Sequence, residues 1–308
     1  MTASYPLDRH AVRLQFERRA RRFAAHDALL REIESRMFER LDLMRVDVTR
    51  VIDLGCGPGR SLAALARRFP RAFVVGVDLA HAPLVAAGGE VGALAAVRRL
   101  LASVRPSHSV PALVEADFSA LPFADASFDV AYSNAALHFD PEPHRVLPAW
   151  ARLVRPGGLV LFSVFGPDTL AELRELWPTD PRQAFIPFVD MHDIGDMLVE
   201  AGFTAPVIEM ETLTLTYPSA DGLLAELHAL TGNPRADRPK GLSGRRHLAR
   251  LSAAMERLRG PDGRYSLKVE VVTAHAWRSE PRQRSERLPD GSTATHVPFN
   301  GIARKPRS

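Results

Sequence analysis

Cysteine is almost absent from this sequence of 308 residues, which contains only Cys56. A single thiol cannot form an internal disulfide, so a disulfide-rich secreted scaffold is excluded and a reducing compartment is favoured. Apolar runs approaching the ~20 residues that span a bilayer are also absent. The N-terminal segment lacks the apolar stretch of a secretory signal peptide. A cytoplasmic protein with no membrane partner is therefore expected.

Aromatic residues make up only 7% of the chain, and no motif of a known nucleic-acid reader is present. The formal net charge is +4 and the sequence pI is about 9.6, which favours acidic partners only mildly. No nucleic-acid partner and no metal site are predicted. The hydrophobic content of 46% and the charged content of 25% are those of an ordinary globular protein.

Short apolar runs alternate with helical patterns from about residue 50 onward. Each run ends in polar residues or glycine, and most of the intervening segments place apolar residues at helical spacing. This alternation predicts a parallel sheet covered by helices on both faces. The predicted strands are 50–55, 72–79, 111–118, 128–134 and 158–166, and the predicted helices are 59–69, 82–104 and 143–154.

Further elements are predicted on both sides of this region, which we interpret as part of one domain over 50–277. Residues 10–45 have the apolar spacing of a helix, within an N-terminal helical lid over 1–49. The later part of the chain is predicted to contain two more strands, a helical insert that contributes to the lid, and a disordered polar tail. These segments are 205–217 and 263–277, 219–258, and 278–308, respectively.

The segment "VIDLGCGPGRS" (51–61) places three glycines at every second position after an apolar run. A Walker A loop requires a lysine that Arg60 does not supply, and a dinucleotide fingerprint has the different spacing G-x-G-x-x-G. Asp53, just before the glycines, would repel a pyrophosphate and attract a positively charged ligand. The loop therefore predicts a site for a cationic ligand that carries no phosphate.

Acidic residues follow the next two predicted strands as well. Asp78 ends "FVVGVD", where a carboxylate accepts hydrogen bonds from the two ribose hydroxyls of a nucleoside. Asp117 and Phe118 follow the third strand and are placed to bind an adenine by its edge and its face. A nucleoside with a cationic, amino-acid-bearing end satisfies all of these features, and S-adenosylmethionine is that molecule.

Four motifs together resemble a class I S-adenosylmethionine-dependent methyltransferase. They are "VIDLGCGPGR", "VVGVDLA", "EADFSALPFADASFDVAYSNAALHF" and "RLVRPGGLVLFSVFG", in order over about 50–166. The resemblance implies a Rossmann-like, mainly parallel sheet of seven strands, the last two over 205–217 and 268–277. The stretch 81–110 is longer than the usual second helix, so no contact is assigned inside it. The implied cofactor is S-adenosylmethionine, bound by Asp53, Gly55, Cys56, Gly57, Gly59, Asp78, Leu79, Asp117, Phe118 and Asn134.

Segments outside these motifs are similar to malonyl-[acyl-carrier protein] O-methyltransferase of biotin synthesis. They are "VRLQFERRARRFAAHDALLREI", "SNAALHF", "FSVFGPDTLAELRELW", "IPFVDMHDIGDMLVEAGF" and "GRYSLKVEVVTAHAW", and the similarity covers most of 10–277. The resemblance implies methyl esterification of the free carboxylate of a malonyl thioester on acyl-carrier protein. A carboxylate is ionised at neutral pH, so it needs no general base but requires hydrogen bonds and a cation.

The acceptor site is interpreted on this basis. His138, Arg174 and Tyr132 are predicted to be the catalytic residues near the acceptor, with Arg174 or His138 pairing the carboxylate. Phe16 and Phe165 are predicted to form walls that exclude water. The basic segment 233–250 is either a solvated surface or a docking site for an acidic carrier protein or its phosphopantetheine.

Other functions fit parts of the pattern. "FGPDTLAELR" and "VDMHDIGDMLVEAGF" also resemble a mitochondrial complex I assembly factor of this fold, which is a protein-arginine hydroxylase. A methyltransferase for another small-molecule acceptor is a second alternative, and a non-catalytic protein that binds the cofactor is a third. These functions predict different outcomes. The methyltransferase would transfer a methyl group to a malonyl thioester, the hydroxylase would increase the mass of a partner arginine, and the non-catalytic protein would bind the cofactor without turnover.

Overall fold

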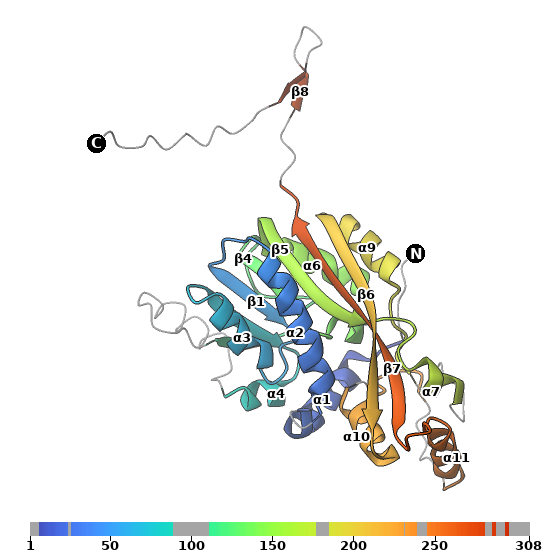
Figure 1. Cartoon of the computed structure of the whole chain (residues 1–308). Helices are drawn as coiled ribbons and strands as arrows, with labels where there is room; N and C mark the ends of the chain where they lie inside the picture. Colours follow the sequence, from blue (N-terminus) through green and yellow to red (C-terminus); the bar gives the residue numbers. More distant parts are fainter. Residues whose placement is uncertain are drawn as a thin grey trace.

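The structure is a computed structural model that describes residues 6–23, 26–88, 111–176, 185–230, 232–238, 245–280, 285–287 and 293–295. Its centre is a seven-stranded sheet in the order β3-β2-β1-β4-β5-β7-β6 (Figure 1). The first five of these are parallel, and β7 runs antiparallel to β5 and β6. The strands are β1 Arg50–Leu54, β2 Phe73–Asp78, β3 Ala112–Glu115, β4 Phe128–Ser133, β5 Val154–Phe165, β6 Phe203–Tyr217 and β7 Tyr265–Arg278.

The central strands are buried on both faces, because successive side chains point to opposite sides of the sheet. In β1, Val51 belongs to one hydrophobic cluster and Ile52 to another, and neither is exposed to solvent. In β5, Leu161 likewise belongs to the first cluster and Phe162 to the second. The near-continuous apolar runs in the sequence are the direct consequence of this two-sided burial.

Helices cover both faces, as the alternation of apolar runs predicts. Leu29, Ile33, Met37 and Leu41 form the apolar stripe of α2 and pack with α3 residues in one cluster. Trp150 of α6 and Leu198 of α9 pack in the other cluster. These helices are α2 Ala28–Leu43, α3 Arg60–Arg68, α6 Pro143–Leu153 and α9 Met191–Glu200. The predicted α/β fold with a mainly parallel seven-stranded sheet is confirmed.

The strand order reverses between β1 and β4, because β2 and β3 lie to one side of β1 and the later strands lie to the other. The loops after neighbouring parallel strands leave in opposite directions at such a point, and ligands of open α/β sheets bind there. The carboxyl ends of β1, β2, β3 and β4 share this edge. The fold therefore places Gly55, Asp78, Asp117 and Asn134 around one region.

Three later helices accompany the long antiparallel strands β6 and β7. Helix α7, Ala171–Leu176, follows β5, and the segment between β6 and β7 contains α10, Ala220–Leu230, and α11, Arg245–Glu256. In Figure 1 these helices lie toward one end of the hairpin, and α10 lies beside α1. Helices α10 and α11 fall within the predicted helical insert 219–258.

Three elements differ from their predicted extent. The single helix expected over 10–45 is two helices, α1, Arg9–Phe23, and α2. Within the expected helix 82–104 the structure describes α4, His81–Ala86, and a turn to Gly88; the remainder, like most of the long stretch 81–110, lies outside the described residues. The described parts of the tail form a small antiparallel pair of strands, β8, Ser285–Arg287, and β9, Thr293–Thr295.

Candidate functional site

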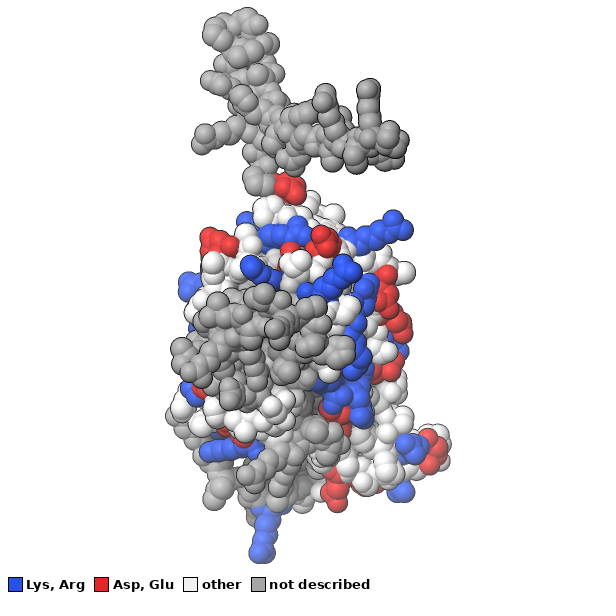
Figure 2. Space-filling model, turned by 90° about the vertical axis from the view of Figure 1, so that its left-hand side faces the viewer, with Lys and Arg blue, Asp and Glu red and all other residues white. Residues whose placement is uncertain are grey.

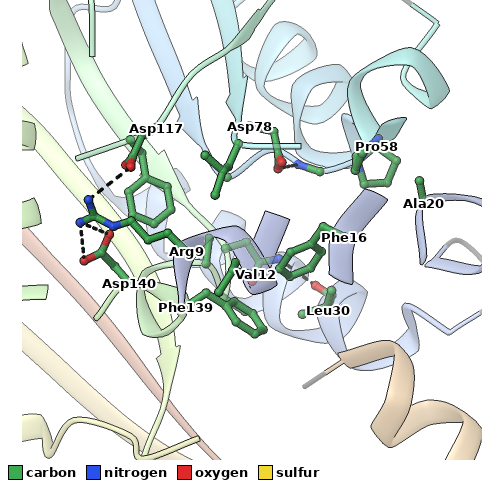
Figure 3. Close-up of a pocket in the computed structure, with 18 of the residues that line it drawn as sticks. Arg9, Val12, Phe16, Ala20, Leu30, Pro58, Asp78, Asp117, Phe139 and Asp140 are labelled. Carbon is green, nitrogen blue, oxygen red and sulfur yellow. Dashed lines mark hydrogen bonds and ion pairs between the residues drawn. The ribbon is translucent and has the colours of Figure 1, made fainter. Parts of the chain in front are cut away.

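A pocket of about 920 Å³ lies at the strand edge described above, beneath helix α1 (Figure 3). The strand-end loops and α1 form opposite walls, so the pocket is enclosed between the sheet and the N-terminal helix. The residues from α1 follow one another at helical spacing, which indicates that a single face of α1 covers the pocket. The strand-end loops contribute Gly55, Gly57, Asp78, Leu79, Asp117, Phe118 and Asn134, and α1 contributes Arg9, Val12, Phe16 and Ala20.

The glycine loop approaches both the pocket and the loop after β4. Gly55 has a φ of +78°, and a Cβ at this position would lie 2.4 Å from the Cβ of Ala136. Gly57 has a φ of +53°, and a Cβ there would meet no atom within 4 Å, so its backbone borders open space. Gly59, with a φ of +76°, precedes α3 and does not line the pocket. The first two glycines therefore shape the cavity, and the third starts the helix.

Asp78 presents a carboxylate to the pocket from the end of β2. It accepts hydrogen bonds from the backbone N–H of Gly57 at 2.8 Å and of Ala80 at 2.9 Å. Desolvation raises the pKa of Asp78 to about 6, although these N–H groups act in the opposite direction. The carboxylate is therefore held in a fixed orientation at the pocket wall.

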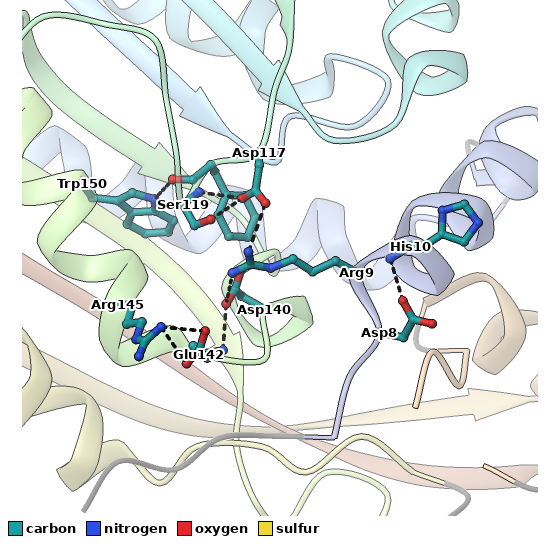
Figure 4. Close-up of polar contacts among 10 residues, drawn as sticks. Asp8, Arg9, His10, Asp117, Ser119, Asp140, Glu142, Arg145 and Trp150 are labelled. Carbon is teal, nitrogen blue, oxygen red and sulfur yellow. Dashed lines mark hydrogen bonds and ion pairs between the residues drawn. The ribbon is translucent and has the colours of Figure 1, made fainter. Parts of the chain in front are cut away.

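The acidic residue after β3 is held in a similar way (Figure 4). Asp117 accepts hydrogen bonds from the backbone N–H of Ser119 at 2.8 Å and from its hydroxyl at 2.6 Å. The other carboxylate oxygen lies 3.6 Å from Nη1 of Arg9. The ring of Phe118 is fixed edge to face against Trp150, at a centroid distance of 5.8 Å, and also lines the pocket. The structure thus brings together an acceptor and an aromatic ring, as the sequence predicts.

A smaller cavity of about 350 Å³ adjoins the first and shares Gly55, Gly57 and Asn134 with it. Asp53 and Cys56 line this cavity, so they lie beside the main pocket rather than in its wall. Asp53 is only 1% exposed, and its Oδ2 atom has no hydrogen-bond partner. A buried polar oxygen without a partner is costly unless a ligand supplies the missing donor.

Negative charge accumulates around this smaller cavity. Burial, followed by the charges of Glu34 and Asp78, raises the pKa of Asp53 well above its ordinary value. Burial also raises the pKa of Glu34, which accepts a hydrogen bond from Ser61 at 3.3 Å. Arg60 at the cavity lining is already ion-paired with Asp27. A ligand with a positive charge would relieve this repulsion.

Asn134 is held rigidly at the junction of the two cavities. Its amide donates to the carbonyl oxygen of Leu30 at 3.0 Å and accepts from the hydroxyl of Ser163 at 2.9 Å. The next residue, Ala135, has a φ of +52°, an uncommon conformation for a residue with a side chain. Strained backbone of this kind is frequent at functional sites.

The predicted acceptor residues His138 and Tyr132 do not line either cavity. His138 is 4% exposed, stacks on Phe165 at a centroid distance of 4.7 Å, and has no hydrogen bond to either ring nitrogen. Burial lowers the pKa of His138 to about 3, so the ring is neutral and supplies no charge to pair a carboxylate. Tyr132 is fully buried, and its hydroxyl lies 3.6 Å from the sulfur of Met37.

Arg174, the other predicted partner of the carboxylate, lies on α7 and not in the lining of either cavity. Its guanidinium donates to the backbone carbonyl of Pro167. Sequence similarity alone could not locate this side chain, because its direction depends on how α7 packs after β5. The predicted roles of Phe16 and Phe165 as walls agree with their position in the pocket lining.

The sequence reasoning missed Arg9, which crosses the mouth of the pocket from α1. Its Nη2 atom donates to both carboxylate oxygens of Asp140, at 3.2 and 3.0 Å (Figure 4). Further along α1, Glu17 accepts from the backbone N–H of His81 at 2.7 Å and of Ala82 at 2.9 Å, at the start of α4. Helix α1 is therefore held to the rest of the domain by interactions at Arg9 and at Glu17. In the sequence only its amphipathic spacing was visible.

The basic segment 233–250 is only partly a free surface. Arg235 is 8% exposed, and its guanidinium pairs with Asp237 at 2.8 and 2.7 Å. Arg238 and Arg245 are exposed, whereas Lys240 and the side chain of Arg246 lie outside the described residues. Arg235 is thus part of the packing, not of a docking surface.

Figure 2 shows arginine and lysine side chains in a band on one face, with carboxylates at its margins.

In the described part of the chain, no group of histidine, cysteine, aspartate and glutamate side chains is arranged to hold a metal ion. A search of the same residues finds no helix long and apolar enough to cross a membrane.

Comparisons with known proteins agree with the site. A family described as "Methyltransferase domain" matches residues 52–162. The malonyl-[acyl-carrier protein] O-methyltransferase of Laribacter hongkongensis is 40% identical over 293 residues, which cover 94% of this chain and 96% of the relative. The protein of the same description from Methylovorus sp. is 38% identical over 94% of this chain and 95% of that relative. The chain belongs to the malonyl-[acyl-carrier protein] O-methyltransferase family.

The fold of this family member also resembles solved structures. The YcgJ protein from Bacillus subtilis superposes with a TM-score of 0.53 at 15% identity, covering 80% of this chain and 98% of that one. At this identity the likeness concerns the fold alone. Family membership confirms the predicted enzyme class, an S-adenosylmethionine-dependent methyltransferase, and with it the predicted cofactor.

The residues present fit S-adenosylmethionine. The unpartnered oxygen of Asp53 and the surrounding carboxylates suit the cationic amino-acid end of the molecule. Asp78 is placed for ribose hydroxyls, and Asp117 with Phe118 is placed for an adenine. The two adjoining cavities would thus divide the cofactor between its amino-acid part and its nucleoside part.

Proposed function

We propose that this protein transfers the methyl group of S-adenosylmethionine to the free carboxylate of a malonyl thioester carried on acyl-carrier protein. The observation that carries the proposal is the similarity to malonyl-[acyl-carrier protein] O-methyltransferases along nearly the whole chain. By the same resemblance the product would enter biotin synthesis, because the ester masks the charge that elongation enzymes reject.

The chemistry of the pocket supports a carboxylate acceptor. Bound S-adenosylmethionine supplies a methyl group on a positively charged sulfur, which is already a good leaving group. A carboxylate is ionised at neutral pH, so its oxygen can accept the methyl group without a general base. No neutral nucleophile has to be deprotonated, and the neutral, buried His138 is consistent with that.

The protein contributes by binding the cofactor and the acceptor, by orienting them toward each other, and by excluding water. Asp53, Asp78 and Asp117 would hold the amino-acid end, the ribose and the adenine of the cofactor, respectively. Val12 and Phe16 of α1 close the pocket from above, and the ring of Phe16 packs edge to face on Phe139 at a centroid distance of 4.9 Å. Exclusion of water prevents the competing hydration of the carboxylate and keeps the reacting groups aligned.

Transfer of a labelled methyl group tests the proposal directly. The purified protein should label malonyl-acyl-carrier protein and should leave acetyl-acyl-carrier protein unlabelled, because the acetyl group has no free carboxylate. Asp78→Asn should abolish labelling at low cofactor concentration. Rescue of a biotin-requiring strain that lacks the malonyl methyltransferase is the matching cellular experiment. Cofactor binding without any transfer to the malonyl thioester would contradict the proposal.

The alternative of a protein-arginine hydroxylase predicts a mass increase of one oxygen on a partner arginine and no consumption of the methyl group. Nothing in the described structure favours it. Mass spectrometry of the carrier protein after the reaction separates the two functions, because methyl esterification adds a CH₂ unit to the malonyl group.

A further inference from the structure

Arg19 on α1 is a partly buried cation, and one of its guanidinium nitrogens has no partner. Its Nη1 atom is shielded from solvent and makes no hydrogen bond, and within the described residues no ion pair engages the side chain. Burial lowers the pKa of Arg19 to about 10, and no carboxylate acts in the opposite direction. The guanidinium remains charged at neutral pH, so its buried Nη1 lacks the acceptor that a charged donor requires.

The position of Arg19 on the helix places it beside the pocket. The α1 residues that line the cavity are Arg9, Val12, Phe16 and Ala20, and Arg19 follows Phe16 by three positions and Val12 by seven. Residues at these spacings lie on one side of a helix. Arg19 therefore flanks the covering face of α1, on the side away from Arg13 and Glu17.

On its other side, Arg19 lies against the segment that follows α10. A Cβ at Gly232 would lie 2.4 Å from Nη2 of Arg19, so the guanidinium rests against the glycine backbone. This segment is fixed to the chain before α1, because Asp8 N–H donates to Pro234 at 3.0 Å and Ala236 N–H donates to Pro6 at 2.8 Å. Arg19 thus lies where α1 faces the segment 232–238.

The other cations around the two cavities are already neutralised. Arg9 is paired with Asp140 and Asp117, Arg60 is paired with Asp27, and burial keeps the nearby His138 neutral. An anionic acceptor would also be repelled from the carboxylates around Asp53. Arg19 lies beside these cavities rather than in their lining, and it is the one of these three arginines without an ion pair among the described residues.

We propose that Arg19 binds the carboxylate of the acceptor, which enters between α1 and the segment 232–238. The inference rests on the proposed function and specifies which residue recognises its substrate. An arginine presents two parallel N–H donors to a carboxylate and gains strength where water is excluded. Arg19 takes the role that the sequence reasoning gave to Arg174 or His138.

The experiment uses malonyl-N-acetylcysteamine thioester, which has the carboxylate but neither carrier protein nor phosphate. Arg19→Gln should raise the KM for this probe by roughly 10- to 100-fold, the loss of one charged hydrogen-bonding pair. Calorimetric affinity for S-adenosylhomocysteine should stay within about twofold. Arg19→Lys, which keeps the charge, should recover part of the loss. Arg18→Gln removes an exposed arginine from the same helix and should change neither quantity.

Folding and binding are separated by two further measurements. Arg19→Met removes the unpaired buried charge, so its thermal midpoint should equal or exceed that of the wild type. Calorimetry with S-adenosylhomocysteine present should show that the wild type binds the malonyl probe more tightly than the acetyl probe, and that Arg19→Gln loses this difference.

The outcomes distinguish the inference from the proposed function. Wild-type methylation of the malonyl probe together with an unchanged KM in Arg19→Gln would overturn the role of Arg19 and leave the function standing. If the wild type methylates neither the probe nor malonyl-acyl-carrier protein, both statements fall. An effect of Arg19→Gln that appears with malonyl-acyl-carrier protein but not with the phosphate-free probe would assign Arg19 to the phosphopantetheine phosphate and overturn the inference.

Discussion

Nη2 of Arg9 lies 3.0 Å from Oδ2 of Asp140, a residue 131 positions later in the chain. Asp140 is 4% exposed, and the same arginine approaches Asp117, the carboxylate placed for the adenine. Arg9 therefore connects the covering helix to the wall of the cofactor pocket. Closure of the helix and occupation of the pocket should be thermodynamically coupled through this side chain.

Loss of Arg9 should weaken cofactor binding without abolishing it. The arginine side chain is 42% exposed, so the pair is worth about 1 kcal/mol, or roughly a fivefold loss of affinity for S-adenosylhomocysteine in Arg9→Gln. A double-mutant cycle with Asp140→Asn should show coupling of that size, measured by calorimetry. Arg18→Gln serves as the control for charge on the same helix. Additive effects in the cycle would argue against the connection.

The first and second glycines of the loop should respond differently to a methyl group. Gly55→Ala should destabilise the fold, because the new Cβ would lie 2.4 Å from the Cβ of Ala136 and the φ of +78° is unfavourable. Gly57→Ala carries only the conformational strain, about 1 kcal/mol, but it introduces a methyl group at the cavity.

The matched variant for this comparison is Gly55→Ala combined with Ala136→Gly. Removal of the opposing Cβ should restore part of the stability lost in Gly55→Ala, measured as the free energy of unfolding in urea. The strain from φ should remain, so the rescue is expected to be incomplete. Equal stability of the single and double variants would show that the two loops do not approach as closely as the structure indicates.

The sequence indicated which strand-end residues lie around the cavities, because the information is local. Asp53, Asp78 and Asp117 each end or follow a buried strand, and parallel strands bring their carboxyl ends to one edge. Once the strands are recognised from their apolar runs, it follows that these side chains lie near one another. The separation of Asp53 and Cys56 into an adjoining cavity required the packing of α2 against the loop.

The acceptor side could not be predicted in the same way. The interaction of Arg9 with Asp140, and the position of Arg19 against Gly232, depend on contacts between distant segments with no local signal. The spacing over 10–45 continued through the break between α1 and α2, so the covering helix was not recognised as a separate element. Asp27, a typical residue at a helix start, was the available signal for that break.

The carboxylate of Asp78 should make cofactor binding dependent on pH. Its pKa is about 6 in the folded protein, so it becomes protonated below that value and loses its ability to accept two ribose hydrogen bonds. The dissociation constant of S-adenosylhomocysteine should therefore rise as pH falls from 7 to 5. Asp78→Asn should bind weakly at all pH values, with a flatter profile. A wild-type affinity that does not change over this range would rule out an ionised Asp78 as the ribose acceptor.

Asp78 and His138 should affect stability in opposite directions on acidification. The unfolded chain releases the Asp78 proton near the ordinary value of 3.8, whereas the folded protein keeps it to about 6. The folded state thus binds more protons between these values, and this group lowers stability as pH rises through the window. The carboxylate borders a pocket, so its contribution is about 1–2 kcal/mol. Asp78→Asn should remove it and stabilise the unliganded protein at pH 7.

His138 has the reverse sign, because its pKa is lowered to about 3 from an ordinary value of 6.5. The unfolded chain binds the proton first, so stability from this group is complete above pH 6.5 and is lost as pH falls toward 3. The expected loss is about 2 kcal/mol between pH 6.5 and pH 5. His138→Phe keeps a ring against Phe165 and should abolish this part of the pH dependence, measured by urea unfolding. His10→Gln, at an exposed position, should retain it. Since Asp78 is common to all three proteins, its opposing contribution cancels in the comparison. An equal slope in wild type and His138→Phe would mean that His138 is not held neutral in the folded protein.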